Sequence, residues 1–210
     1  MRSNFAAIHP NWRHRQRGAI IRSFQQAQRN AALLDTIPGG LLMQAVIVPG
    51  DKTKEGQLIE AVALPWFEIV KLIQRDPESI YQLDWRKWEE IIAGAYKQQG
   101  FDVILTPRSN DKGRDIIASS HGLGSIRIFD QVKAHRPGHP VTADDVRAMI
   151  GVLESEGNVS KGIVTTTSAF APGIMQNQNI TRFMPYRLEL RARDELLQWL
   201  GSIAGQNSIV

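Results

Sequence analysis

Apolar side chains recur every three or four residues along residues 84–99, which is the spacing of one face of an α-helix. Gly100 follows directly, and glycine is common just after the last helical residue. The pattern therefore predicts an amphipathic helix. Its buried stripe consists of Trp88, Ile91, Ile92, Ala95 and Tyr96.

Three short β-type segments follow this helix, over residues 101–106, 115–119 and 125–133. The tight His-Gly-Leu-Gly segment at residues 121–124 predicts that the last two of these strands form a hairpin.

A second helix and further strands complete the pattern. Thr142 and Asp145 are placed as in a capping box at the start of a helix, and residues 161–166 and 188–190 are typical of buried strands. A last amphipathic helix carries Leu196, Leu197, Leu200 and Ile203. The order predicts an α/β protein with one mixed β-sheet flanked by helices and an α-β-β-β-α-β core.

The first 80 residues have a less regular pattern. We expect a helix over residues 18–34, a strand over residues 41–48 and a second helix over residues 57–75, kinked at Pro65.

Positive charge is concentrated at the start of the chain. The net charge is +4, and residues 1–34 contain six arginines and no Asp or Glu. A solvated basic arm explains this as well as a phosphate-contacting extension does. In the second interpretation Arg13, Arg15 and Arg17 bind DNA. We therefore assign residues 1–80 to a small basic N-terminal region for DNA binding or dimerisation, and residues 81–205 to the folded domain.

Composition narrows the class of protein. The chain has 210 residues, of which 42% are hydrophobic and 22% charged, which is ordinary for a soluble globular protein. It contains no cysteine, which excludes a thiolate zinc site or a cysteine nucleophile and suits a reducing cytosol. No apolar run approaches about 20 residues. We expect a cytoplasmic protein with no membrane partner.

The candidate chemistry lies at the ends of neighbouring predicted strands. Asp115 begins one strand, and Gln131 and Lys133 end the next. Because side chains alternate along a strand, Gln131 and Lys133 share a face, and Asp130 points the other way, where it could pair with a basic side chain. A carboxylate, an amide and an ammonium group at adjacent strand ends could hold a metal ion and a phosphate together. This placement favours a Mg²⁺-dependent nuclease.

Helix geometry distinguishes Glu89 from Glu90. At about 100° per residue, Glu89 borders the apolar stripe, whereas Glu90 faces water near Lys97. Only Glu89 can lean into a cleft beside the sheet.

A hard cation such as Mg²⁺ prefers oxygen ligands and takes one or two carboxylates plus waters. We expect Asp115 as the direct ligand, with the backbone carbonyl of Val132 or a water bound to Glu89 completing the shell. Lys133 would orient the attacking water or the phosphate, and the Gln131 amide would bond a water or phosphate oxygen. Each residue alone also fits an ordinary turn or surface role, and it is their joint order that favours a site.

In these segments the chain resembles the Mrr-type (type IV-like) restriction endonuclease domain of the PD-(D/E)XK nuclease superfamily. The matching segments are residues 85–92, 100–103, 110–115, 131–133 and 161–170. Gln131 occupies the superfamily's defining acidic position, as is characteristic of Mrr-like members. The resemblance implies a restriction-endonuclease-like fold, and it assigns the family's metal-binding Asp to Asp115, its Lys to Lys133 and its helix Glu to Glu89.

The resemblance also implies an endonuclease that hydrolyses DNA phosphodiester bonds with Mg²⁺, for which Mn²⁺ could substitute, in defence against foreign or modified DNA. Its partner would be double-stranded DNA, bound by a homodimer or larger assembly that could include a partner defence protein. We expect Lys112, Arg114 and His135, which lie near the site in sequence, to contact DNA. Two alternatives stay open: a catalytically silent DNA-binding or assembly subunit, and a structure-selective repair nuclease.

If the basic arm binds duplex phosphates, replacing Arg13, Arg15 and Arg17 together by Gln should weaken DNA binding more at low salt than at high salt. Each lost contact should flatten the slope of log affinity against log salt by about 0.9. Fluorescence anisotropy with labelled duplex DNA over a salt series measures that slope. An unchanged affinity and slope would assign the arm to solvent or to protein docking.

Overall fold

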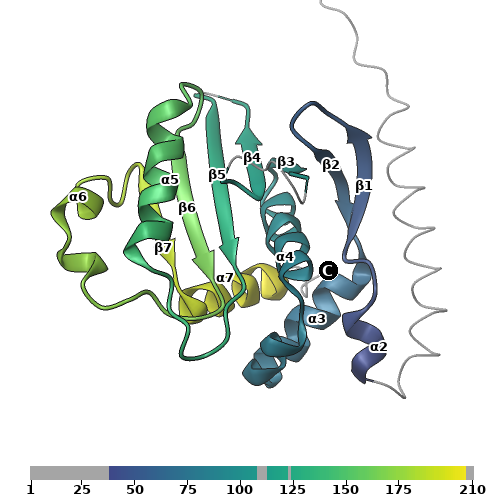
Figure 1. The fold of residues 1–210 in the computed structure, drawn as a ribbon. Coiled ribbons are helices and arrows are strands. Elements are labelled where there is room, and N and C mark those ends of the chain that lie inside the picture. The colour runs from purple at the N-terminus through teal and green to yellow at the C-terminus, as the bar shows by residue number, and fades with distance from the viewer. Residues whose placement is uncertain (1–37, 108–112, 123, 207–210) are drawn as a thin grey trace, which may run out of the picture. The chain divides into compact units, whose positions relative to one another are not determined.

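The chain forms two compact units, Met1–Met43 and Gln44–Val210. In the first unit the structure describes the short helix α2 (Pro38–Leu42), and the helix expected over residues 18–34 lies outside the described residues. The computed structural model describes residues 38–107, 113–122 and 124–206 (Figure 1).

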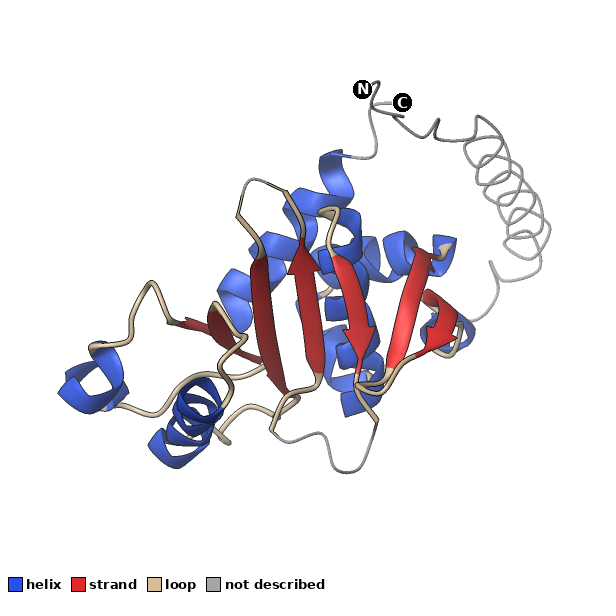
Figure 2. Cartoon of the chain, turned by 90° about the horizontal axis from the view of Figure 1, so that it is seen from above, coloured by secondary structure: helices blue, strands red, loops and turns tan. Residues whose placement is uncertain are grey.

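The second unit is built on one seven-stranded mixed sheet, whose strands lie side by side (Figure 2). Their order across the sheet is their order along the chain. The first five strands pair antiparallel with one another, whereas the sixth and seventh run parallel to the fifth. The strands are β1 (Ile47–Lys52), β2 (Gln57–Val62), β3 (Asp102–Leu105), β4 (Ile116–Ser120), β5 (Ile126–Lys133), β6 (Lys161–Thr166) and β7 (Leu188–Arg191).

Helices connect and cover these strands. The α-helices of the second unit are α3 (Leu64–Arg75), α4 (Trp85–Gln98), α5 (Ala143–Ser155), α6 (Gln178–Thr181) and α7 (Arg193–Gln206), and the 3₁₀ helices are η1 (Pro77–Gln82) and η2 (Ile174–Gln176). Because parallel strands need a crossover connection, α5 carries the chain from β5 to β6. No helix in the described part of the chain is long and apolar enough to cross a membrane.

Local capping explains where the two central helices begin. The Asp84 carboxylate accepts a hydrogen bond from the Lys87 N–H (2.7 Å) at the start of α4. At the start of α5, Thr142 and Asp145 form the reciprocal capping box that their spacing predicts. These side chains satisfy N–H groups that a first helical turn leaves without partners.

The sheet separates two sets of buried side chains. On one face, Ile117, Phe129 and Val164 pack in one cluster with Met149 and Leu153 of α5. On the other face, the buried residues of α4 include Trp88 and Tyr96, and the Tyr96 ring makes an edge contact with Trp199 of α7. Successive residues of a strand alternate between these faces. The faces therefore offer very different surroundings to neighbouring residues of β5.

The order α4, β3, β4, β5, α5, β6 confirms the predicted α-β-β-β-α-β core and its mixed sheet. The hairpin expected around residues 121–124 is also present, because β4 and β5 pair antiparallel on either side of it. In this part of the chain the apolar period and the glycine positions were sufficient to predict the elements.

Two predictions for the preceding segment are wrong. Residues 57–62 form β2 instead of the first half of a helix, and Pro65 lies in the first turn of α3 instead of at a kink. Proline is tolerated there because the first helical N–H groups have no intrahelical partner. The strand expected over residues 41–48 begins only at Ile47.

The strands β1 and β2 also join the same sheet as β3. Residues 44–80, which we assigned to the N-terminal region, therefore fold with the domain that we placed at residues 81–205.

A close helix contact generates a stability prediction. A Cβ at Gly94 in α4 would lie 2.6 Å from Nε1 of the fully buried Trp66, whose indole N–H donates to the Ile91 carbonyl (2.8 Å). Gly94→Ala should therefore lower the free energy of unfolding by about 1–3 kcal/mol. Gly151 in α5 is the control, because a Cβ added there would meet no other atom within 4 Å. Gly151→Ala should stabilise by about 0.5–1 kcal/mol in urea unfolding, and equal effects of both changes would contradict this packing.

Candidate active site

Asp115 is fixed at the junction of three strands. Its backbone N–H donates to the Asp130 carbonyl of β5 (2.9 Å), and its own carbonyl accepts from the Thr106 N–H at the end of β3 (2.9 Å). Its carboxylate Oδ2 accepts a hydrogen bond from the Val132 N–H (2.7 Å). The side chain is therefore directed toward the end of β5, where Gln131 and Lys133 also lie.

The Val132 carbonyl is directed to the same side of β5 as the Val132 N–H that binds Asp115. In a strand the N–H and C=O groups of one residue point the same way. Since the Val132 N–H donates to Asp115, its carbonyl also points toward the side on which β4 lies. The orientation suits the ligand role that we expected of this carbonyl.

Gln131 and Lys133 lie on the α5 face of the sheet, as alternation predicts, because both are an even number of residues from Phe129 of the α5 cluster. The Gln131 Oε1 atom is buried, and no hydrogen-bond donor of the described residues reaches it. The Lys133 ammonium lies 3.1 Å from Oδ1 of Asp145, in the first turn of α5. The site thus has one amide oxygen without a donor and one ammonium with an ionic partner.

Asp130 points to the opposite face and is buried there. Its Oδ2 accepts hydrogen bonds from the Tyr96 hydroxyl (2.8 Å) and the Thr165 hydroxyl (3.0 Å), and Arg191 lies 3.8 Å away. Burial raises the pKa of Asp130 to about 7, although the Arg191 charge and these hydrogen bonds oppose the rise. Asp130 therefore links β5 to α4, β6 and β7 and does not share the face of Gln131 and Lys133.

Glu89 is buried, with 2% of its surface exposed, and pairs with Arg86 (2.6 Å). The same Arg86 Nη1 donates to the Thr106 carbonyl (3.1 Å), which places Glu89 near the strand ends where Asp115 lies, on the α4 side of the sheet. Glu90, which we expected to face water near Lys97, is half-buried and pairs with Lys87 (3.1 Å). Lys97 lies 3.9 Å from Asp102 of β3.

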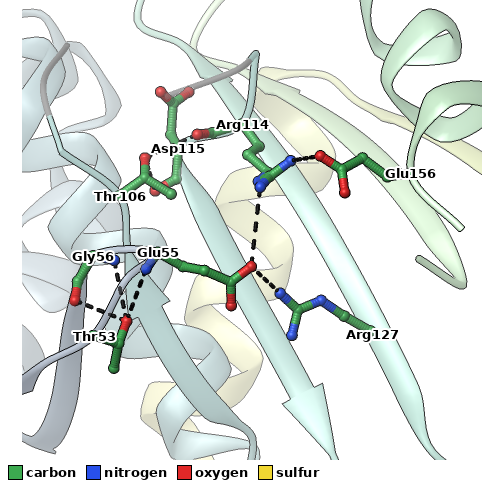
Figure 3. A network of polar contacts seen from close by, with 8 residues as sticks. All are labelled: Thr53, Glu55, Gly56, Thr106, Arg114, Asp115, Arg127 and Glu156. Atoms are coloured by element: carbon green, nitrogen blue, oxygen red, sulfur yellow. Dashed lines mark hydrogen bonds and ion pairs between the residues drawn. The ribbon is translucent and has the colours of Figure 1, made fainter. Parts of the chain in front are cut away.

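Arg114 belongs to a network of ion pairs rather than to an exposed surface (Figure 3). Its guanidinium bonds Glu156 (2.8 Å), lies 4.0 Å from Glu55 and stacks over the Phe129 ring. Glu55 also pairs with Arg127 of β5 (2.5 Å). Arg114 is 7% exposed, and its guanidinium contacts Glu156, Glu55 and the Phe129 ring, which does not fit the DNA contact that we expected of it.

Of the other residues that we expected to contact DNA, only His135 lies within the described part of the chain. Arg13, Arg15, Arg17 and Lys112 lie outside the described residues. His135 is half-buried on the loop after β5, where its Nδ1 lies 3.2 Å from the His139 carbonyl. The loop lines an open depression of about 530 Å³ beside Asp145. Hydroxyl groups of Thr167 and Ser168 bond the backbone carbonyls of His135 and Arg136 and hold this loop in place.

Two neighbours of the predicted residues were not found from the sequence. Arg86 precedes Glu89 by three residues, which is a spacing that pairs side chains on one helix and could have been noticed. Asp145 had been explained as a helix cap, and no local signal relates it to Lys133, which is twelve residues earlier in the chain.

The donor set fits a hard cation. The Asp115 carboxylate, the Val132 carbonyl and the orphan Gln131 Oε1 are all oxygen atoms, which Mg²⁺ prefers over nitrogen and sulfur. The described residues contain no cluster of three or more His, Cys, Asp or Glu side chains that could enclose a metal. With the one carboxylate of Asp115 among these oxygen atoms, the arrangement suits an ion that takes one or two carboxylates and several waters.

Residues 80–200 match the Mrr_cat family model, whose description is "Restriction endonuclease". The match covers more than half of the chain, which therefore belongs to the Mrr-type restriction endonuclease family of the PD-(D/E)XK nucleases. The curated "Uncharacterized protein y4cE" of Sinorhizobium fredii (strain NBRC 101917 / NGR234) is 23% identical over 130 residues, which cover 61% of this chain and 32% of that protein. The chain spans about a third of the length of this relative.

Three solved restriction endonucleases are similar at lower levels. FokI has a TM-score of 0.45 and 13% identity, over 68% of this chain and 28% of its own. The "DNA modification-dependent restriction endonuclease AspBHI" has a TM-score of 0.41 and 13% identity, over 78% and 44%. MspJI in complex with a 27-mer oligonucleotide has a TM-score of 0.38 and 18% identity, over 69% and 34%. These TM-scores are low, so the family assignment rests on the match of residues 80–200 to the family model alone.

The raised pKa of Asp130 predicts a pH-dependent stability. Asp130 loses its proton near pH 4 in the unfolded chain and near pH 7 in the folded protein. The protonated carboxyl therefore contributes fully to the free energy of unfolding below about pH 4, and this contribution is lost as the pH rises to about 7. Between these values the free energy of unfolding of the wild type should fall relative to that of Asp130→Asn. Urea unfolding of both proteins across this range measures the difference, and a constant difference would refute the assignment.

Proposed function

We propose that this chain is a metal-dependent DNA endonuclease. The proposal rests on one observation above all: the Asp115 carboxylate is held by the Val132 N–H at the end of the strand that presents Gln131 and Lys133. Hydrolysis of a phosphodiester needs a positioned water, stabilisation of charge on the phosphate and assistance to the leaving oxygen. The residues at this strand end have the chemical groups for these tasks.

Asp115 and the Val132 carbonyl would hold the metal, and the Gln131 amide oxygen would bind a water of its shell. When bound, a Mg²⁺ ion would supply positive charge to the phosphate and lower the pKa of a bound water. Lys133 would orient the attacking water or the phosphate through its three N–H donors. Glu89, already held by Arg86, would act through a water at the α4 side of the site. Mn²⁺ has similar ligand preferences and could replace Mg²⁺.

The substrate that best fits this family is double-stranded DNA, and the role is defence against foreign or modified DNA. Membership of the restriction endonuclease family supports this role. We further propose that the protein works in the cytoplasm as a homodimer or larger assembly, because two strands of a duplex require two cleavage events. Residues 1–43 and the loop that carries His135 are the proposed DNA-contacting regions.

A catalytically silent DNA-binding subunit is the second candidate. The observation that favours it is that Glu89 and Lys133 are both neutralised by ion pairs within the chain, with Arg86 and Asp145. The buried Gln131 oxygen, which meets no donor among the described residues, favours the active enzyme, because such an atom costs free energy unless a water or ion satisfies it.

Replacing Asp115 tests the proposal directly. Asp115→Asn preserves the acceptor for the Val132 N–H but removes the charge, so cleavage of plasmid DNA in Mg²⁺ should fall at least a hundredfold, or about 2.7 kcal/mol of barrier. Asp102→Asn is the matched control, because Asp102 also stands at the start of a strand, with a side chain that is 65% exposed. The wild type should cut methylated or unmethylated plasmid with Mg²⁺ and not with EDTA. Full activity of Asp115→Asn would exclude this site.

A further inference from the structure

The two oxygens of the Asp145 carboxylate have different partners. Oδ2 accepts hydrogen bonds from the backbone N–H of Thr142 (3.0 Å) and from its hydroxyl (2.6 Å), which closes the capping box of α5. Oδ1 lies 3.1 Å from the Lys133 ammonium. The helix cap thus fixes one oxygen, and the orientation of the other follows from it.

The position of this carboxylate is set by a rigid part of the fold. α5 packs through Val146 and Met149 against the sheet face on which Phe129 lies. Lys133 lies on the same face of β5, two residues after Gln131, so the start of α5 and the end of β5 meet. A carboxylate held by a packed helix can direct a flexible side chain, whereas a carboxylate on a mobile loop cannot.

An ion pair of this kind contributes little to stability. Both side chains are about a quarter exposed, 24% for Lys133 and 28% for Asp145, and pairs in contact with water are weak. Its effect on geometry is larger, because a lysine side chain has four rotatable bonds and loses considerable rotamer freedom when held in one direction. If the ammonium must meet a phosphate or a water, holding it in advance removes that cost from the reaction.

We propose that Asp145 is a positioning residue for Lys133. It uses one oxygen to cap α5 and the other to hold the Lys133 ammonium on the face of β5 that also carries Gln131. The inference rests on the proposed nuclease function for its effect on cleavage, but the contact itself can be measured without any cleavage. Asp145 lies within the family match but outside the segments that carried the sequence resemblance.

The capping box offers a matched set of variants. Its helix position accepts Glu or Gln equally well, because either side chain can reach back to the N-cap N–H. Asp145→Gln and Asp145→Glu therefore both preserve the cap, and only the Glu variant preserves a carboxylate for Lys133. Asp144→Asn is the control for charge in the same helical turn, because Asp144 pairs with Arg147 and is 86% exposed.

The first experiment measures plasmid cleavage in Mg²⁺. Asp145→Gln should lower kcat about tenfold or more with KM changed by less than about threefold, whereas Asp145→Glu should recover at least half of the wild-type kcat. Asp144→Asn should cut like the wild type, and all three should unfold at similar temperatures. A kcat for Asp145→Gln equal to that of Asp145→Glu, or higher than that of the wild type, would overturn the proposal.

A second experiment separates this proposal from the proposed function. Nuclear magnetic resonance of ¹⁵N-labelled lysine side chains, with the Lys133 signal assigned from Lys133→Arg, reports the mobility of its ammonium group. The signal should be ordered in the wild type and in Asp145→Glu and mobile in Asp145→Gln. Equal mobility in all three proteins overturns the role of Asp145 whether or not the protein cuts DNA. If the Lys133 signal is ordered in the wild type and in Asp145→Glu and mobile in Asp145→Gln, but the wild type does not cut DNA, the contact is supported and only the nuclease function is rejected.

Discussion

The pairing of β4 with β5 is the constraint on which the candidate site depends. Ile116 pairs with Asp130, and just before it the Asp115 N–H donates to the Asp130 carbonyl, so the Asp115 carboxylate can accept the Val132 N–H. A slip of one residue in this register would move Gln131 and Lys133 to the opposite face. The buried Ile117 and Phe129 pair oppose such a slip, because it would take Phe129 out of the cluster that both form with α5.

Neighbouring residues of β5 have separate roles because the two sheet faces are covered differently. The α5 face brings Asp145 to Lys133, and the α4 face encloses Asp130 with Tyr96 and Arg191. The contacts of Asp130 with Tyr96 and Arg191 stabilise β5 on the α4 face and do not involve Gln131 or Lys133 on the other face. A buried carboxylate with a raised pKa is often a functional signal, but here its partners come from elements that hold the sheet together.

The hairpin of β1 and β2 extends the structure beyond the family match and supports it near Asp115. Gly56 approaches β3 so closely that a Cβ there would lie 2.3 Å from the Leu105 carbonyl oxygen. Glu55, one residue earlier, bonds Arg127 and lies near Arg114, which directly precedes Asp115 (Figure 3). The Asp115 side chain points away from these ion pairs (Figure 3), and its carboxylate instead accepts a hydrogen bond from the Val132 N–H of β5.

The sequence by itself determined the α-β-β-β-α-β core from residue 84 onward and the placement of Gln131 and Lys133 on one strand face, because helical and strand periods are local properties. It did not determine that residues 57–62 form β2, since their partners in β3 lie about 45 residues away. Nor did it show that Arg114 is held by Glu156 and Glu55, or that Asp145 reaches Lys133. Only the tertiary structure decided these contacts, because each joins charged groups whose proximity depends on how separate elements pack.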